Sequence, residues 1–322
     1  MEIDKDCRKK FEKQGYRLVG KHSAIKICNW TRESLRNKNF CYKQQFYGIN
    51  SHRCVQMSCT LLNCQNKCLH CWRDLSFTDS NKIKTADKPE KIIDECIEQQ
   101  RIILQGFKGN KKTNLKKFLE AMNPTQFAIS LTGEATLYPY LTELIKELKK
   151  RKINSFLVSN GLLPEKILEL KNKCALPTQL YISLNYPNEK IFRKLTNNKD
   201  KESWKKLMKT LKILSKLNKK TRTVLRLTLI KSLNIIEPEN YAKLIKKANP
   251  MFVEIKAYMH IGFSQHRLKK ENMPLHEEVK EFANKIGKLC KYKIIDEKKD
   301  SRVVLLMKKP QKSRFLGPEN FK

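Results

Sequence analysis

The sequence contains no run of apolar residues long enough to cross a membrane. No stretch approaches the roughly 18 consecutive apolar residues that a membrane helix needs, and the first residues, MEIDKDCRKK, lack the apolar segment of a secretion signal. We therefore expect a cytoplasmic protein with no membrane association. Because the cytosol keeps thiols reduced, the eleven cysteines indicate metal or redox chemistry rather than disulfides.

Acidic residues are also scarce. The 322 residues include 32 Asp and Glu against 68 Lys and Arg, which gives a formal charge of +36. Because so large a positive charge attracts phosphates, nucleic acid is the expected partner. The alternative is that the lysines only cover solvated helix faces. The densest basic runs contain no aromatic residues and therefore indicate no stacking surface for single strands; they are 111–117, 148–152 and 215–222.

One cysteine cluster lacks the fourth ligand that a structural zinc ion requires. The stretch CQNKCLHCWRD places Cys64, Cys68 and Cys71 at the spacing C-x3-C-x2-C. Tetrahedral zinc takes four N or S ligands, whereas a cubane iron–sulfur cluster on three thiolates keeps its fourth iron open to a chelating ligand. The spacing therefore favours an iron–sulfur cluster. Two alternatives stay open, namely zinc completed by His70 and a chance cluster of buried cysteines.

From about residue 125 onward, β-rich runs alternate with amphipathic runs, which is typical of βα units around a parallel sheet. Leu and Ile recur at helical spacing in the segments 141–151 and 203–218. With a strand just before the cysteine trio, the chain has six βα units. These predict an α/β fold with a partial TIM barrel, (βα)6. The predicted strands are 53–60, 125–132, 153–159, 178–185, 222–230 and 251–259.

Residues outside the six units divide into two further segments. Residues 1–50 fit no βα unit and have the character of an added lobe, and residues 301–309 are expected to pair at an edge of the sheet. We therefore expect an N-terminal extension over residues 1–52, a (βα)6 core over residues 53–297 and a C-terminal tail over residues 298–322.

Polar residues follow three of the predicted strands, at the carboxyl ends where parallel α/β folds gather their reacting groups. A glycine allows close approach of the backbone, a glutamate offers a carboxylate, and residues two apart in a strand share one face. Each residue is equally typical of turn chemistry or of a satisfied polar group. The candidates are Gly133, Glu134, Ser159, Asn160, Ser183 and Asn185.

The cysteine trio, the Gly-Glu pair and the six βα units together resemble the radical S-adenosylmethionine superfamily over residues 53 to about 297. The resemblance implies that Cys64, Cys68 and Cys71 hold a [4Fe-4S] cluster, whose open iron binds the amine and carboxylate of S-adenosylmethionine. It also implies that Glu134 binds the methionyl ammonium, with the other polar candidates as cofactor contacts. The sequence departs from the superfamily in two places: TGEA at 132–135 replaces the usual Gly-Gly-Glu-Pro, and His70 replaces an aromatic residue.

A second cysteine trio narrows the resemblance. Cys28, Cys41 and Cys54 lie at equal intervals, C-x12-C-x12-C, a spacing as typical of packing residues as of ligands. Together with the segments NCQNKCLHCWRD, GFKGN, VEIKAYMHIGFS and DSRVVLL, this trio resembles the tRNA 4-demethylwyosine synthase family, in its single-domain archaeal type. The resemblance implies that these three cysteines hold a second [4Fe-4S] cluster.

The family resemblance further implies a radical carbon–carbon lyase that acts on N1-methylguanosine at position 37 of tRNAPhe. The 5′-deoxyadenosyl radical removes a hydrogen from the N1-methyl group, the carbon radical adds to C2 of pyruvate, C1 is lost, and a third ring closes. Eukaryotic members carry a flavodoxin-like donor that residues 1–50 have no room for. We therefore expect an external electron donor of the flavodoxin or ferredoxin type, and a monomer.

Pyruvate has two candidate anchors. In extended chain Lys43 would share a face with Cys41, so its amine is placed to form a Schiff base with the ketone. Alternatively, pyruvate chelates the open iron of the second cluster. An ordinary lysine in so basic a chain is a solvated residue, and only the family match of CYK distinguishes Lys43.

Two competing functions remain at this point. Another radical enzyme with an auxiliary cluster, such as a peptide-modifying one, shares the cysteine pattern but needs neither tRNA nor pyruvate. A zinc-containing RNA-binding module would explain the cysteines and the charge without turnover. Iron, sulfide and zinc contents separate the zinc module from both enzymes.

Overall fold

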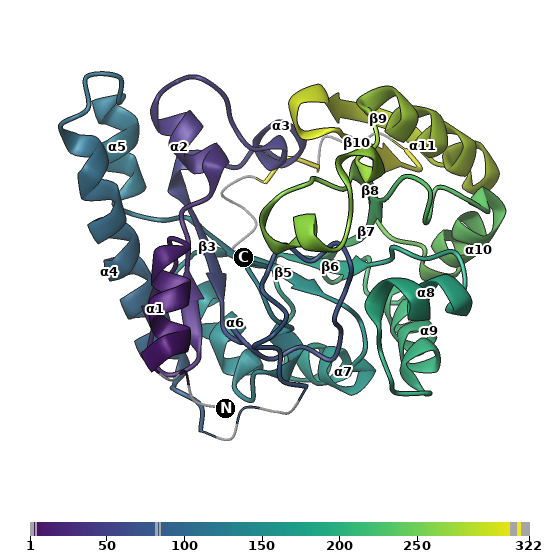
Figure 1. Ribbon diagram of the computed structural model, residues 1–322, viewed down its shortest axis with the longest axis horizontal. Coiled ribbons are helices and arrows are strands. Elements are labelled where there is room, and N and C mark those ends of the chain that lie inside the picture. The colour runs from purple at the N-terminus through teal and green to yellow at the C-terminus, as the bar shows by residue number, and fades with distance from the viewer. Residues whose placement is uncertain (1–2, 4, 81–82, 84, 310–313, 317–322) are drawn as a thin grey trace.

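Six parallel strands form the centre of one sheet in the computed structural model, which describes residues 3, 5–80, 83, 85–309 and 314–316 (Figure 1). Within these residues the sheet has ten strands, in the order β1-β2-β3-β4-β5-β6-β7-β8-β10-β9. Neighbouring strands from β3 to β8 run parallel. The remaining pairs, at both edges, are antiparallel. The chain therefore has an α/β fold with a mostly parallel sheet, as predicted.

All six predicted central strands are confirmed. They are β3 Cys54–Ser58, β4 Gln126–Ile129, β5 Asn154–Ser159, β6 Gln179–Ser183, β7 Arg222–Leu229 and β8 Phe252–Ala257. The predicted strand at 301–309 is β10, Val303–Met307, which pairs antiparallel with β8. It does not form the edge, because β9, Lys293–Lys298, pairs with its other side. Apolar and polar residues do not alternate regularly in the β9 sequence, KIIDEK, so the hydrophobic pattern did not predict this strand.

Helices connect the parallel strands, and the predicted helical segments 141–151 and 203–218 are α6 and α9. In α6, Leu144, Ile145 and Leu148 are buried at the expected spacing. The last four residues of the second segment, 215–218, are not helical, since α9 ends at Leu214. The helices are α4 Pro89–Lys108, α5 Leu115–Ala121, α6 Leu141–Lys150, α7 Pro164–Asn172, α8 Glu189–Thr196, α9 Ser203–Leu214, α10 Pro238–Ala248 and α11 His276–Cys290.

Successive strand residues point to two different apolar cores, as the pleat of a strand requires. In β7, Leu225 and Leu227 lie in the large core that the connecting helices cover. Val224 lies in a smaller core on the opposite face, together with Phe156 and Tyr181. We call this opposite face the inner face of the sheet. It carries the polar residues described below.

The N-terminal residues extend the sheet and cover its inner face. Strands β1, Arg17–Val19, and β2, Ser23–Ile25, join the sheet through an antiparallel pair between β2 and β3. Tyr42, Phe46 and Tyr47 of α3 pack into the inner core. Residues 17–25 of the predicted N-terminal extension therefore belong to the same sheet as the core. The helices here are α1 Lys5–Lys13, α2 Asn29–Leu35 and α3 Tyr42–Tyr47.

The predicted C-terminal tail is likewise part of the sheet where the structure describes it. Strand β10 lies between β8 and β9, and the backbone N–H of Leu316 donates to the carbonyl of Tyr47 at 2.8 Å. Residues 310–313 and 317–322 of that tail lie outside the described residues. Among the described helices, none is long and apolar enough to span a membrane.

Candidate functional site

The two cysteine trios lie at opposite ends of strand β3. Cys54 is the first residue of β3, and Cys64 follows in the loop after its last residue, Ser58. At about 3.3 Å per residue, the strand itself spans about 13 Å. We call the loop over residues 64–73 the cysteine loop. Because β3 to β8 are parallel, the residues that follow the other strands lie at the same edge as this loop.

The three thiols of the cysteine loop converge. Burial raises the pKa of Cys68 well above its ordinary value, and the neighbouring thiols of Cys64 and Cys71 raise it further. Burial also raises the pKa of Cys64 to about 11, whereas the guanidinium of Arg73 opposes that rise. Arg73 is itself buried and donates to the carbonyl of Leu61 at 3.1 Å. A cation is thus fixed beside thiols that a metal cluster would hold as thiolates.

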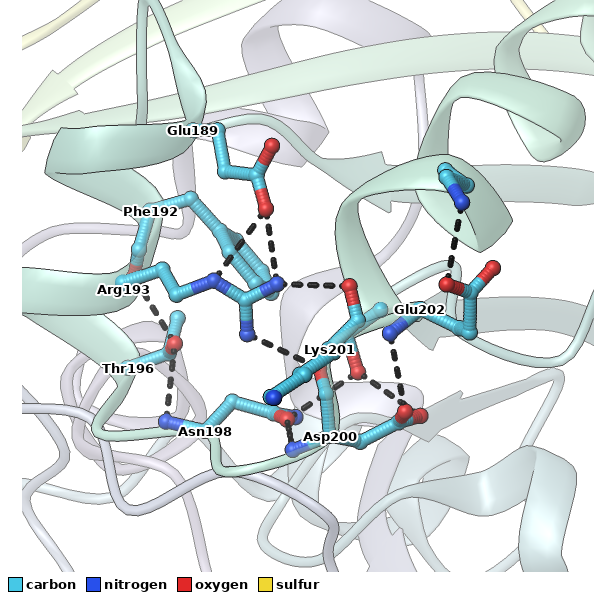
Figure 2. Close-up of polar contacts among 10 residues, drawn as sticks. Glu189, Phe192, Arg193, Thr196, Asn198, Asp200, Lys201 and Glu202 are labelled. Carbon is cyan, nitrogen blue, oxygen red and sulfur yellow. Dashed lines mark hydrogen bonds and ion pairs between the residues drawn. The ribbon is translucent and has the colours of Figure 1, made fainter.

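The turn between α8 and α9 holds one side of the cysteine loop (Figure 2). The backbone N–H of Lys67 donates to the carbonyl of Thr196 at 2.8 Å. The side-chain amide of Asn198 donates to Asn66 Oδ1 at 2.7 Å and to the Gln65 carbonyl at 3.3 Å. Asn198 is in turn fixed, because its Oδ1 accepts the backbone N–H of Asp200 at 2.9 Å.

Arg193 makes this turn rigid. Its guanidinium donates to the carbonyls of Asp200 and Lys201 at 2.8 and 2.7 Å and pairs with Glu189 at 2.7 Å, as Figure 2 shows. Glu189 lies in α8, whereas Asp200 and Lys201 lie in the turn itself. The turn therefore presents Asn198 to the cysteine loop in one conformation.

The segment after β8 holds the other side of the cysteine loop. The backbone N–H of Phe263 donates to the carbonyl of Trp72 at 2.9 Å. Arg267 donates to the carbonyls of Leu69, at 3.2 Å, and Cys71. At Gly262, which has a φ of +57°, a Cβ would lie 2.5 Å from the Trp72 oxygen. The HIGFS motif is thus a support for the cysteine loop.

Glu134 lies at the same edge of the sheet, buried and surrounded by donors. Its Oε1 accepts hydrogen bonds from the Thr136 hydroxyl at 2.6 Å and the Ser159 hydroxyl at 2.8 Å. Its Oε2 accepts the backbone N–H of Asn160 at 2.7 Å. Burial raises the pKa of Glu134, and these hydrogen bonds oppose the rise. The structure thus brings together three predicted site residues, Glu134, Ser159 and Asn160.

Position 133 must be a glycine because the backbone of Thr60 lies directly against it. Its φ is +71°, and a Cβ there would lie 1.8 Å from the carbonyl oxygen of Thr60. The next residue, Glu134, donates its backbone N–H to the carbonyl of Asn63 at 2.7 Å. The close approach at Gly133 is thus one between two loops of the protein, whereas the sequence predicted a close approach to a ligand.

Asn185 lies beside the cysteine loop, with its amide nitrogen 3.4 Å from Nε2 of His70. Burial lowers the pKa of His70 to about 4, and the nearby Arg226 and Arg267 lower it as well. Ser183 ends β6 on the inner face, with its Cα opposite that of Arg226 in β7. The structure therefore places Asn185 against the cysteine loop, whereas Ser183 lies on the inner face of the sheet.

The second trio also converges, around Lys43. Burial raises the pKa of Cys41 to about 11, and the Cys28 thiol raises it further, whereas Lys43 lowers it. Burial raises the pKa of Cys54 to about 12; Lys43 again opposes the rise, and Cys28 and Cys41 add to it. Three thiols from three segments of the chain thus meet beside one amine, which suits a cluster of the kind that the first trio suits.

Lys43 lies inside the protein, contrary to the reading of an ordinary solvated lysine. It is 8% exposed, and its ammonium lies 4.8 Å from the ring centre of Phe156 and 4.9 Å from that of Tyr181. The local geometry differs from the predicted extended chain, because Lys43 is in the first turn of α3 and only Cys41, its N-cap, is extended. The amine nevertheless lies beside the trio, as predicted.

Among the described residues, no group of three His, Cys, Asp or Glu side chains lies close enough to hold a single metal ion. Around one zinc ion, thiolates at 2.3 Å from the metal crowd within about 4 Å of one another. A four-iron cluster offers a different iron to each thiolate, so its ligands stand further apart.

The sequence-based prediction missed three charged residues on the inner face. Glu254 is fully buried and accepts the hydroxyls of Tyr47 at 2.6 Å and Tyr42 at 3.0 Å. Arg226 and Lys256 are half-buried. Burial lowers the pKa of Lys256 to about 8, and repulsion by Arg226 lowers it further. The sequence did carry a signal for these residues, because Arg226 and Lys256 interrupt the apolar strand segments RTVLRLTLI and MFVEIKAYM.

Two family models match the chain. One is described as the radical SAM superfamily and matches residues 60–245, and the other is described as wyosine base formation and matches residues 247–308.

The chain is 46% identical over 308 residues to the S-adenosyl-L-methionine-dependent tRNA 4-demethylwyosine synthase of Pyrococcus horikoshii, which covers 95% of this chain and 90% of the relative. It is 39% identical over 316 residues to the protein of the same name from Methanocaldococcus jannaschii, which covers 96% and 98%. A solved structure of TYW1 with a lysine–pyruvate adduct bound has a TM-score of 0.86 and 37% identity, and covers 98% of this chain and 99% of that chain.

Proposed function

The chain belongs to the tRNA 4-demethylwyosine synthase family of radical S-adenosylmethionine enzymes, and from this membership we propose that it condenses N1-methylguanosine of tRNAPhe with pyruvate to form 4-demethylwyosine. Strands β3 to β8 are the proposed partial barrel, and the inner face holds the reacting groups. The observation that carries the proposal is the buried amine of Lys43 between the second trio and the rings of Phe156 and Tyr181.

The cysteine loop is the proposed site of the first [4Fe-4S] cluster and S-adenosylmethionine. When bound, this cofactor pair supplies the 5′-deoxyadenosyl radical that removes a hydrogen atom from the N1-methyl group. Cys64, Cys68 and Cys71 bind the cluster, and Glu134 accepts the methionyl ammonium. Ser159 and Asn160 orient the carboxylate of Glu134 through their hydrogen bonds. Gly133, Ser183 and Asn185 complete the proposed set of cofactor contacts.

The second trio is the proposed site of the pyruvate reaction. Cys28, Cys41 and Cys54 hold the second [4Fe-4S] cluster, and Lys43 forms a Schiff base with the ketone of pyruvate. The Lys43 amine lies against the rings of Phe156 and Tyr181, where a small ketone can reach it, and a lysine amine attacks such a carbonyl in its unprotonated form. The two trios lie at opposite ends of β3, so both substrates meet between them on the inner face.

The proposed partners follow from the family and the charge. The excess of Lys and Arg binds the phosphates of tRNAPhe, and the anticodon loop offers a base that is already unstacked. An external electron donor of the flavodoxin or ferredoxin type reduces the cluster on the cysteine loop. We propose that the enzyme acts in the cytoplasm as a monomer.

The test uses anaerobically purified enzyme reconstituted with iron and sulfide. Incubated with tRNAPhe containing N1-methylguanosine, pyruvate, S-adenosylmethionine and dithionite, it should convert the methylated base to one with the mass of 4-demethylwyosine. No such base should form without pyruvate. Replacing Cys64, Cys68 and Cys71 with Ala should remove about four irons and abolish S-adenosylmethionine cleavage.

The matched variant replaces Cys28, Cys41 and Cys54 with Ala. It should also lose about four irons, but it should still cleave S-adenosylmethionine without forming the tricyclic base. Cleavage that persists without the cysteine loop trio would contradict the assignment of that trio. If the enzyme cleaves S-adenosylmethionine yet ignores tRNA and pyruvate, another radical reaction, such as peptide modification, takes the place of the proposed one. Zinc without sulfide in the purified protein would support the RNA-binding module instead.

A further inference from the structure

The inner face carries three cations that form no ion pair or side-chain hydrogen bond with another described residue. These are Lys43 on α3, Arg226 on β7 and Lys256 on β8, which we call the inner cations. They are neighbours: Lys43 and Arg226 lie 4.9 and 5.9 Å from the centre of the same ring, that of Tyr181. Lys256 interacts electrostatically with both of the other cations. A positive centre is thus built between the two cysteine trios.

The inner cations have no hydrogen-bond acceptor in the part of the chain that the structure describes. Their contacts there are with aromatic rings, and Lys256 lies 5.9 Å from the ring centre of Tyr42. The carboxylate of Glu254 interacts electrostatically with Lys256, but its oxygens already accept the hydroxyls of Tyr42, Tyr47 and Tyr181. Charged groups away from bulk water are costly unless they are paired. The inner cations therefore indicate an anionic ligand.

Arg222 shows that this pattern is specific to the inner cations. It lies four residues before Arg226, on the same face of β7, and stacks on Tyr47 and Phe252. Its guanidinium, however, donates to Gln179 Oε1 at 2.9 Å and to the carbonyl of Arg314. The buried guanidinium of Arg222 thus has acceptors in the protein, whereas Arg226, with five N–H donors, has none among the residues that the structure describes.

The charges indicate a ligand with one negative charge. Three inner cations and the carboxylate of Glu254 leave two positive charges. A [4Fe-4S] cluster in its +2 state on the three thiolates of the second trio would contribute one net negative charge. One positive charge then remains, which is the amount that a single carboxylate matches. The planar fork of an arginine also fits a carboxylate through two parallel hydrogen bonds.

We propose that Arg226 and Lys256 bind the carboxylate of the 2-oxo acid whose ketone reacts with Lys43. This proposal rests on the proposed function and adds the residues that distinguish a 2-oxo acid from a simple ketone. The Lys43 nitrogen forms an imine with the carbonyl carbon and the carbonyl oxygen leaves as water, while the two other inner cations hold the carboxylate attached to that carbon. A phosphate of the RNA is the other oxyanion that these cations could take, and the experiment separates the two sources.

The experiment measures trapping at Lys43 rather than turnover. Anaerobic holoenzyme is treated with borohydride over a series of pyruvate concentrations, and the adduct is measured by intact-protein mass and peptide mapping. Acetone, which lacks the carboxylate, is the second probe. In Arg226→Gln and in Lys256→Gln, the pyruvate concentration for half-maximal trapping should rise by about tenfold or more, because each variant loses a charge-assisted contact. Trapping of acetone should not change.

Arg222→Gln is the matched control and should leave the half-maximal pyruvate concentration unchanged. Equal losses for pyruvate and acetone would overturn the proposal, because they would show an effect on the Lys43 amine and not on the carboxylate. Unchanged pyruvate trapping with weaker tRNA binding would overturn it in favour of a phosphate site.

Binding of radiolabelled pyruvate by equilibrium dialysis separates this proposal from the proposed function. If wild-type enzyme shows no adduct at Lys43 but binds pyruvate, and Arg226→Gln and Lys256→Gln weaken that binding, the carboxylate site stands and only the Schiff base is wrong. If wild-type enzyme neither binds nor traps pyruvate, both proposals fall.

Discussion

Asn160 donates its backbone N–H to the carboxylate of Glu134 at 2.7 Å, while its side-chain amide donates to Gln65 of the cysteine loop at 3.0 Å. One residue thus links the carboxylate proposed to bind S-adenosylmethionine to the loop proposed to carry its cluster. The position of the Glu134 carboxylate relative to the cysteine loop is therefore fixed by contacts within the protein.

Replacing Glu134 with Gln tests that link. The amide would turn a donor group toward the N–H of Asn160 or the hydroxyl of Ser159 and would remove the negative charge. We expect affinity for S-adenosylmethionine to fall by about tenfold to a hundredfold, since a charge-assisted hydrogen bond is lost, while iron content stays at the wild-type value. Equilibrium dialysis with labelled S-adenosylmethionine measures it. Glu143→Gln, an exposed change on α6, is the control and should have no effect.

Gly133→Ala should damage the same site by a steric route. A Cβ would meet the carbonyl oxygen of Thr60 at 1.8 Å, and the left-handed backbone costs a non-glycine residue about 1–2 kcal/mol. We expect a loss of at least that stability and weaker binding of S-adenosylmethionine, measured by denaturant unfolding and dialysis. Gly106→Ala, in α4 with open space around it, should instead stabilise by about 0.5–1 kcal/mol. Equal effects of both changes would remove the special role of Gly133.

Asn198→Asp should loosen the cysteine loop. The change keeps the oxygen that accepts the Asp200 N–H but removes the donor to Gln65 and Asn66, and it places a negative charge against Asn66 Oδ1. We expect the first cluster to be lost faster when a chelator is added. The loss is measured by the decrease in the visible absorbance of the cluster. Asp200→Asn is the control, because it keeps an oxygen for the N–H of Glu202 and leaves the loop contacts intact. A wild-type rate in Asn198→Asp would show that other contacts suffice to hold the loop.

Lys43→Ala should uncouple the enzyme. Without the amine, pyruvate has no covalent anchor, so S-adenosylmethionine is still cleaved but no tricyclic base forms. Borohydride with pyruvate should label wild-type Lys43 and leave the variant unlabelled. If Lys43 only pairs with the carboxylate, Lys43→Arg should keep part of the activity, because the charge survives. Lys298→Ala is the matched control, since Lys298 is also 8% exposed and lies over a ring, that of Phe40, but has Asp300 as a partner 3.9 Å away.

Affinity for tRNA should fall steeply as salt rises. Each phosphate that the protein neutralises releases condensed counterions and steepens the slope of log K against log salt by about 0.7 to 0.9. The excess positive charge of +36 predicts several such contacts, and filter binding or fluorescence anisotropy between about 50 and 200 mM salt covers the useful range. A flat response would show that the lysines are only solvated.

The structure places the three basic runs at different distances from the cysteine trios, which the sequence could not show. Lys149 and Lys150 end α6, and residues 215–222 follow α9, so both runs precede a strand and lie away from the cysteine loop. At those positions the cations also stabilise the ends of their helices. The run at 111–117 differs, because Lys117 donates to the carbonyl of Ser34 in α2 at 3.2 Å and so lies near the segment that carries Cys28. The charge pattern could not distinguish these positions.

The sequence by itself determined the features that depend on local spacing. The C-x3-C-x2-C trio lies in one loop, and alternation of apolar residues specified all six parallel strands, because the pleat and the helix period act over a few residues. Strands β1, β2 and β9 were not predicted, since they are short or polar and are strands only because a neighbour offers an edge.

Only the tertiary structure decided which distant residues meet. Lys43 looks like any other lysine in the sequence, and it became a buried amine because α3 packs on the inner face of the sheet. Arg226 and Lys256 are neighbours because β7 and β8 pair in parallel, with Thr228 opposite Lys256. These placements depend on the order and register of the whole sheet, which no short stretch of sequence contains. Local spacing therefore fixed the cysteine loop trio, and long-range packing fixed what surrounds it.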